Sequence, residues 1–126
     1  MTTERINFED IIGLIFSKVE NIDNEEIVFT VNENESYRLF HWQDCCENVQ
    51  VESIVGDLED LTNSPILQAE ESSQEGKSSW GSQTWTFYKI ATIKGYVTIR
   101  WLGESNGYYS ESVNFEMNLK DCGEDD

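Results

Sequence analysis

The chain has 126 residues, of which 38% are hydrophobic and 12% aromatic, enough apolar material to fill the core of one domain. Its 25 acidic and 8 basic residues give a net charge of −17. This charge repels nucleic-acid phosphates and anionic membranes, and the sequence has no basic patch that would release counterions from phosphate. It therefore argues against direct binding of nucleic acid or a membrane surface.

The acidic residues are concentrated in the first part of the chain. Residues 1–75 hold 18 acids and 3 bases, whereas residues 76–126 hold 7 acids and 5 bases. A negative field attracts basic protein surfaces, although the simpler explanation is that it keeps a small domain soluble. No secretory hydrophobic region opens the chain, and no apolar run reaches the roughly 18–20 residues that span a bilayer. We therefore expect a cytoplasmic protein.

A helix is predicted to begin after Asn7, a preferred N-cap residue followed by acids in the first turn. Apolar residues from Phe8 to Ile15 follow helical spacing, and Gly13 fits a C-terminal cap. We expect a short helix here, followed by a strand through Leu14–Glu20.

Alternating apolar residues next predict a hairpin and a further strand. Ile27–Val31 and Tyr37–His41 alternate on either side of the polar turn Asn32–Ser36, and Val49–Val55 resumes the pattern.

The middle of the chain predicts short elements and a loop. Asp57–Leu61 is typical of a helical turn, and Ile66–Glu71 is a candidate short strand. Residues 72–83 are rich in Ser, Gly and Gln, and we expect them to form a surface loop.

The stretch Thr84–Met117 predicts three consecutive antiparallel strands, with turns at Lys94-Gly95 and Ser105–Gly107. The residues expected to share one face within each strand are Trp85, Phe87, Ala91 and Ile93; Val97, Ile99 and Trp101; and Val113, Phe115, Met117 and Leu119. A two-residue turn at Asn106-Gly107 would put the third set on the opposite face from the second. We therefore expect an odd-length loop or a bulge, with Gly103 as its site.

Together these elements predict one α+β domain over residues 1–126, with a mainly antiparallel sheet and one or two short helices. The acidic tail over residues 120–126 is predicted to be frayed.

The cluster most suggestive of chemistry is His41–Glu47, which holds the only histidine, two of the three cysteines and two carboxylates. Candidate zinc ligands are His41, Cys45 and Cys46, with Asp44, Glu47 or Cys122 as a fourth. Structural zinc sites usually take ligand pairs from separate turns, and adjacent cysteines point apart in an extended chain. We therefore favour reduced thiols packed as small hydrophobes, with the histidine hydrogen-bonded at a strand end, and predict no metal or cofactor.

No motif identifies an enzyme. A Cys–His dyad on this turn is geometrically possible but rare. The sequence has no glycine-rich phosphate loop, nucleophile elbow or His-Glu-x-x-His helix. We predict no catalytic residues.

Four stretches carry a resemblance to a known family: QDCCE (Gln43–Glu47), GDLEDL (Gly56–Leu61), SPILQAEE (Ser64–Glu71) and, above all, TWTFYKIATIKGYVTIRWLGESNGYYSESVNF (Thr84–Phe115). Through them the chain resembles a family of small proteins from phages and prophages, over a range from Phe8 to Phe115. The resemblance supplies no catalytic residues. It implies a phage-encoded protein that acts in the cytoplasm of a bacterial host.

Small acidic phage proteins that act inside bacteria are frequently inhibitors of defence nucleases. We therefore expect a non-catalytic anti-CRISPR or anti-restriction inhibitor, a DNA mimic that occupies the basic nucleic-acid-binding surface of a nuclease such as a CRISPR effector. The candidate partner-binding residues are Glu25, Glu26, Glu33, Glu35, Glu52, Asp57, Glu59, Asp60, Glu70 and Glu71. The alternatives are a metal- or redox-dependent module centred on His41, Cys45 and Cys46, and a phage assembly accessory protein.

Overall fold

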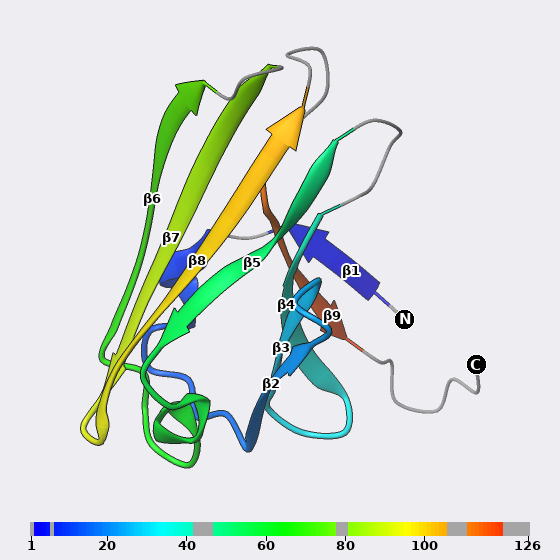
Figure 1. The fold of residues 1–126 in the computed structure, drawn as a ribbon. Coiled ribbons are helices and arrows are strands. Elements are labelled where there is room, and N and C mark those ends of the chain that lie inside the picture. Colours follow the sequence, from blue (N-terminus) through cyan, green and yellow to red (C-terminus); the bar gives the residue numbers. More distant parts are fainter. Residues whose placement is uncertain (1, 6, 42–46, 78–80, 106–110, 120–126) are drawn as a thin grey trace.

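A computed structural model describes residues 2–5, 7–41, 47–77, 81–105 and 111–119 and shows two antiparallel β-sheets that face each other (Figure 1). The first sheet contains β1 (Thr2–Arg5), β2 (Lys18–Ile22), β3 (Glu26–Thr30), β4 (Glu35–Phe40) and β9 (Asn114–Leu119), and the second contains β5 (Asn48–Val55), β6 (Gln68–Lys77), β7 (Ser82–Thr92) and β8 (Gly95–Ser105). Their spatial orders are β1-β9-β4-β3-β2 and β5-β8-β7-β6.

Within the described ranges, the only helical elements are two 3-10 turns, η1 (Phe8–Ile11) and η2 (Leu58–Leu61). The α+β class predicted from the sequence is therefore wrong in its helical part, while the mainly antiparallel sheet is confirmed. Neither turn approaches the length of a membrane-spanning helix. The fold is a single all-β domain.

Aromatic side chains from both sheets and from η1 fill the space between the sheets. The ring of Phe8, from η1, lies 6.5 Å from that of Phe29 in the first sheet and 4.7 Å from that of Tyr88 in the second. Trp101 and Tyr88 are fully buried. Since burying one large apolar side chain contributes about 1.5–3 kcal/mol, this cluster holds the two sheets together.

The predicted hairpin and the following strand are confirmed as β3, β4 and β5, and the helical turn near Asp57 is confirmed as η2. The helix expected after Asn7 is the single turn η1. In place of a strand through Leu14–Glu20, Ile15 and Phe16 form isolated bridges and β2 begins at Lys18.

The loop predicted over residues 72–83 is wrong, because most of it is strand. β6 runs through Lys77 and β7 begins at Ser82, paired in regular register from Gln68↔Ala91 to Lys77↔Ser82. The prediction failed because these residues are polar and do not alternate with apolar ones. A strand whose side chains remain exposed to water does not need that alternation. The tail over residues 120–126 lies outside the described residues.

Trp85 and Phe87 share one face of β7, as predicted, but that face is the outer one. Thr86, Tyr88 and Ile90 point inward and are buried, whereas Trp85 and Phe87 are half-buried on the outer face. The Trp85 ring packs over β6, where a Cβ added to Gly76 would lie 2.8 Å from it. Trp85 therefore covers the backbone of β6 at Gly76, and the aromatic side chains on the outer face of the strand do not mark the core.

The third strand of the predicted meander belongs to the other sheet. β9 pairs with β1 and β4, with Phe115 opposite Leu39, and not with β8. The irregularity predicted at Gly103 is wrong, because Gly103 pairs regularly with Thr84 and Val49. The mismatch between the faces arises because the chain crosses from one sheet to the other between β8 and β9. Residues 106 and 107 of the turn predicted at Ser105–Gly107 lie outside the described residues.

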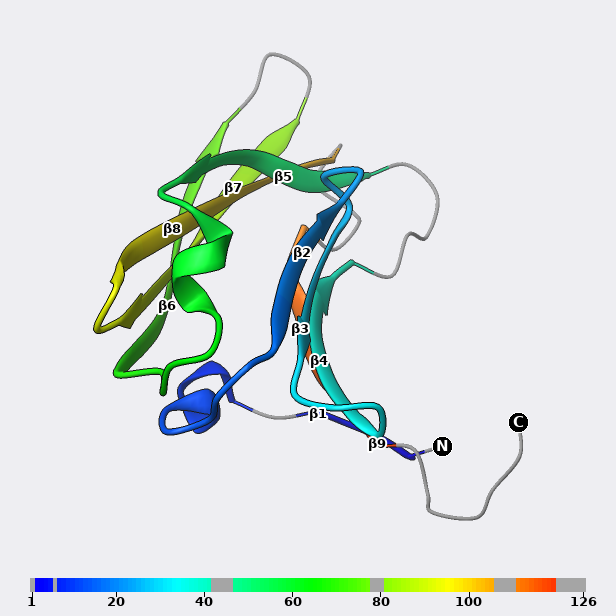
Figure 2. The same cartoon turned by 90° about the horizontal axis from the view of Figure 1, so that it is seen from below.

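The two sides of the sandwich differ. On one side, the N–H of Val51 in β5 donates to the carbonyl of Asn24 at 2.7 Å, which joins the second sheet to the tight β2–β3 turn (Figure 2). On the other side the second sheet ends at β6, with η1 behind its lower half (Figure 1). This open side holds the candidate site.

Candidate functional site: an acidic groove beside β6

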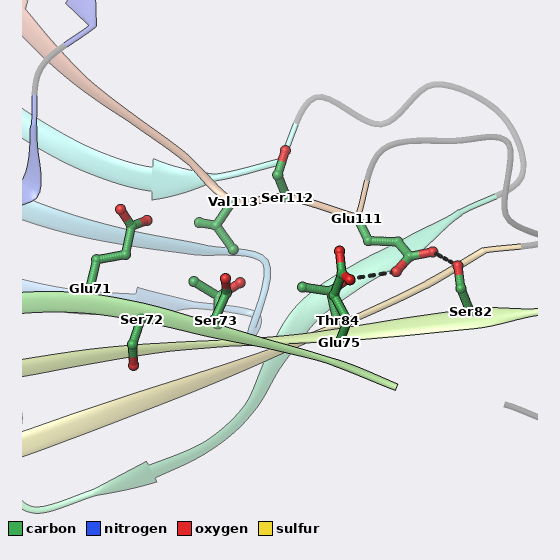
Figure 3. Close-up of a pocket in the computed structure, with 10 residues that line it drawn as sticks. Glu71, Ser72, Ser73, Glu75, Ser82, Thr84, Glu111, Ser112 and Val113 are labelled. Atoms are coloured by element: carbon green, nitrogen blue, oxygen red, sulfur yellow. Dashed lines mark hydrogen bonds between the residues drawn. The ribbon is translucent and has the colours of Figure 1, made fainter. Parts of the chain in front are cut away.

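A polar groove of about 580 Å³ lies between the inner face of β6 and β7 and the segment that leads into β9 (Figure 3). We call it the acidic groove, and its lining residues are Glu71, Ser72, Ser73, Glu75, Ser82, Thr84, Thr86, Glu111, Ser112 and Val113. The lining contains three carboxylates and no lysine or arginine.

The polar half of the β6–β7 hairpin produces this groove. Its paired inward-facing residues include Ser73 with Thr86 and Glu75 with Thr84. The apolar set on β7 ends at Tyr88, so this part of the inner face has hydroxyls and carboxylates where the rest has core side chains. Such groups are stable only beside water or polar partners, which keeps this end of the sandwich open.

Three hydroxyl donors hold the Glu111 carboxylate. Its Oε2 accepts a hydrogen bond from Ser82 and its Oε1 accepts one from Thr84 at 2.8 Å (Figure 3). Its Oε2 also accepts a hydrogen bond from Ser105. Partial burial raises the pKa of Glu111, but the three hydroxyl hydrogen bonds outweigh it and bring the pKa below its usual value. The groove therefore has a fixed negative charge at neutral pH.

Glu71 is anchored from the core. Its Oε2 accepts a hydrogen bond of 2.6 Å from the hydroxyl of the fully buried Tyr88. Burial raises the pKa of Tyr88, and the hydrogen bond and charge of Glu71 raise it further. Tyr88 thus remains a proton donor across the physiological range, and it positions the carboxylate at the rim of the core.

The arrangement suits binding of separate cationic groups. Within the described residues, no three His, Cys, Asp or Glu side chains converge as a metal ion would require. The groove lining includes no histidine, cysteine or lysine to act as base or nucleophile. Separated carboxylates with neighbouring hydroxyls match the ammonium and guanidinium groups of a basic protein segment, which pair with carboxylates through charge-assisted hydrogen bonds.

The ten acids proposed from the sequence do not lie on one face. Glu26 and Glu35 begin adjacent antiparallel strands, so they lie at opposite ends of the first sheet. Glu70 and Glu71 are consecutive in β6 and point to opposite faces. The other members are distributed over the β2–β3 and β3–β4 turns (Glu25 and Glu33), β5 (Glu52) and the η2 segment (Asp57, Glu59 and Asp60).

Several of the ten acids also have partners within the fold. Glu26 lies 3.4 Å from Arg38, Glu52 lies 2.6 Å from Arg100, and Asp57 accepts the backbone N–H of Glu59 as a cap. Of the ten, only Glu71 lines the groove. The sequence prediction missed Glu75 and Glu111. The alternation of serine and glutamate along β6 was a signal for Glu75, whereas Glu111 lies outside both strands and had no such signal.

His41 is hydrogen-bonded at the end of β4, as predicted. Its Nδ1 lies 2.7 Å from the carbonyl oxygen of Ser112, and its Nε2 lies 2.9 Å from Oε2 of Glu47. A carbonyl only accepts, so Nδ1 carries a proton. To bind a metal, His41 would have to give up one of these contacts. The other proposed ligands, Asp44, Cys45, Cys46 and Cys122, lie outside the described residues.

Comparison with known proteins identifies a family. Neither the curated proteins nor the solved structures include a match to this chain. A family model described as a domain of unknown function, DUF7448, matches residues 9–115. This range includes the second sheet and every residue that lines the acidic groove. The chain therefore belongs to the DUF7448 family.

Proposed function

We propose that this protein is a non-catalytic binding protein that occupies the basic, nucleic-acid-binding surface of another protein and thereby inhibits it. The observation that carries the proposal is the acidic groove, in which Glu71, Glu75 and Glu111 face a space without a basic residue in its lining. Two of these carboxylates are held in place by hydroxyl donors. They need little reordering to receive a cationic side chain.

The charge of the whole chain supports the same partner. A net charge of −17 draws a basic surface toward the domain from a distance and speeds association in a salt-dependent way. The acidic groove then makes the short-range contacts, in which each carboxylate pairs with one lysine or arginine of the partner. A bacterial defence nuclease, either a CRISPR effector or a restriction enzyme, has such a surface where it holds nucleic-acid phosphates.

The positions of the acidic residues indicate where on this protein the partner binds. Because the ten acids proposed from the sequence lie at several separate places, they do not form one continuous strip of charge. We therefore centre the contact on the groove and on the adjoining residues of β6, Glu70 included. The remaining acids contribute to long-range attraction.

Inhibition of purified CRISPR effectors and restriction enzymes, measured with and without the protein at about 0.05 M and about 0.5 M salt, tests the proposal. We expect at least one nuclease to be inhibited, with strong loss of inhibition at high salt. Glu75→Lys should weaken inhibition by about tenfold or more, because it places a cation in the groove.

The matched control is Glu33→Lys, which makes the same charge change at an exposed acid in the β3–β4 turn. It should weaken inhibition by less than about threefold, since only the long-range attraction falls. Equal losses in the two variants would show that net charge alone matters. The absence of inhibition across the panel would contradict the proposal.

The alternative, a metal- or redox-dependent module at His41, has weaker support. Both ring nitrogens of His41 have hydrogen-bonding partners, and its side chain is 3% exposed.

A further inference from the structure

β6 has a long free edge. It pairs with β7 over all ten of its residues without a register shift, and within the described ranges no strand pairs with its other side (Figure 1). The other edge of this sheet, β5, has a register shift between Val51 and Ser53 and is joined to the β2–β3 turn. The edge strands of the first sheet, β1 and β2, have four and five residues.

The chain itself pairs with this edge only just before β6 begins. The N–H of Gly13 donates to the carbonyl of Ile66 at 2.8 Å, and the N–H of Ile66 donates to the carbonyl of Leu14 at 2.9 Å. Ala69 is only 3% exposed, and from Glu70 onward no described residue pairs with this side of the strand. An open edge of this length is a template for another strand.

The pairing pattern determines which backbone groups face outward. The N–H of Leu67 donates to the carbonyl of Ala91 at 2.8 Å, so the backbone of Ala91 faces β6. In an antiparallel pair, alternate residues face the partner. Phe87 therefore faces β6 as well, and its partner Ser72 faces β7. The residues whose N–H and C=O groups point to the free side are Ala69, Glu71, Ser73 and Glu75.

Two hollows follow this edge. One, of about 640 Å³, runs along the first half of β6 and is the more apolar of the two, since the exposed Ile12 and Leu67 line it; its charged lining residues are Glu9, Glu70, Glu71 and Lys89. The other is the acidic groove along the second half. Side chains of an added strand would alternate between the two faces of the sheet. The hollows would thus receive apolar and basic side chains.

We propose that the free edge of β6 receives an extended basic segment of the partner protein as a fifth strand of the second sheet. This mode of recognition derives affinity from main-chain hydrogen bonds and specificity from alternate side chains. That the segment is basic follows from the proposed function. That it is extended follows from the unpaired edge of β6, which accepts a strand. A second copy of this chain is a poor occupant, because Glu70, Glu71 and Glu75 would oppose like charges.

The probe for this inference is a capped decapeptide of alternating lysine and valine, titrated to about 1 mM. Amide hydrogen exchange followed by NMR should show new protection at Glu71, Ser73 and Glu75, the outward-facing residues beyond the buried Ala69. Ser73→Pro removes an outward N–H without changing charge and should weaken peptide binding by about tenfold. Ser73→Ala removes the same groove hydroxyl but keeps the N–H, so it should weaken binding clearly less than Ser73→Pro does.

Ser72→Pro tests the assignment of the two sides. It removes an inward N–H from the β6–β7 ladder and should lower the melting temperature more than Ser73→Pro does. The exchange measurement on the unchanged protein needs no variant, so it decides the inference even where a proline variant fails to fold.

The outcomes separate the inference from the proposed function. No peptide binding up to about 1 mM, or protection confined to other strands, overturns strand addition. If Glu75→Lys weakens peptide binding but Ser73→Pro does not, strand addition at β6 is contradicted and recognition by charge alone is supported. Binding weakened by Ser73→Pro but unchanged by salt and by Glu75→Lys supports the edge and contradicts the basic partner. Protection of β6 through dimerisation at high salt would make a second copy the occupant.

Discussion

Glu111 lies directly against Gly103 of β8. A Cβ added to Gly103 would be 2.5 Å from the carbonyl oxygen of Glu111 and 2.8 Å from its Cβ. The segment that leads into β9 can therefore approach β8 closely only over a glycine. This contact places the Glu111 carboxylate within reach of its hydroxyl donors, so the charge of the groove depends on the absence of a side chain on the neighbouring strand.

Gly103→Ala should lower the free energy of unfolding by about 1–3 kcal/mol, because backbone has to move to admit the methyl group. Urea denaturation measures this change. Gly76→Ala is the control, since its Cβ would meet the Trp85 side chain instead of backbone, and we expect a smaller loss. Equal stability of the unchanged protein and Gly103→Ala would contradict the close contact.

Glu111→Gln should change how stability depends on pH. The pKa of Glu111 is lower in the folded protein than its ordinary value of 4.5, so its stabilising contribution is complete above that value and is lost as the pH falls through the lowered pKa. At pH 7 the variant should be less stable by about 1 kcal/mol, and the difference should shrink below the ordinary pKa. A difference that is constant with pH would contradict this assignment. Urea denaturation of both proteins across the acidic range measures it.

Tyr88→Phe should destabilise the protein by about 1 kcal/mol, since it removes the donor to Glu71 and leaves the aromatic packing in place. Thermal unfolding measures the loss. In the double variant Tyr88→Phe with Glu71→Gln, the two effects should be less than additive, because both remove the same hydrogen bond. Strict additivity would show that the two side chains act independently.

His41→Ala should lower the free energy of unfolding by about 3 kcal/mol, because it removes a partner from the buried Glu47 carboxylate. Chemical denaturation measures the loss. His41→Gln keeps a side-chain donor and should recover part of the stability. A change in His41→Ala below about 0.5 kcal/mol, typical of a surface substitution, would contradict the buried contact.

Local sequence pattern was sufficient to locate most elements. The β3–β4 hairpin, β5 and η2 lie where alternation and capping residues predict them, because neighbouring residues determine these features. The pattern also indicated that Val113 and Phe115 conflict in face with Ile99 and Trp101. It did not explain this conflict, since a strand's own residues do not specify which sheet it joins.

Only the tertiary structure decided that β9 crosses to the first sheet, that Tyr88 and not Trp85 faces the core, and that β6 extends through a polar segment. It also assembled the acidic groove from β6, β7 and Glu111, residues up to forty positions apart in the chain. The physical reason is that strand partners and buried faces are selected by packing between distant segments. Composition can reveal an excess of acids, but only the contacts between strands place three of them around one space.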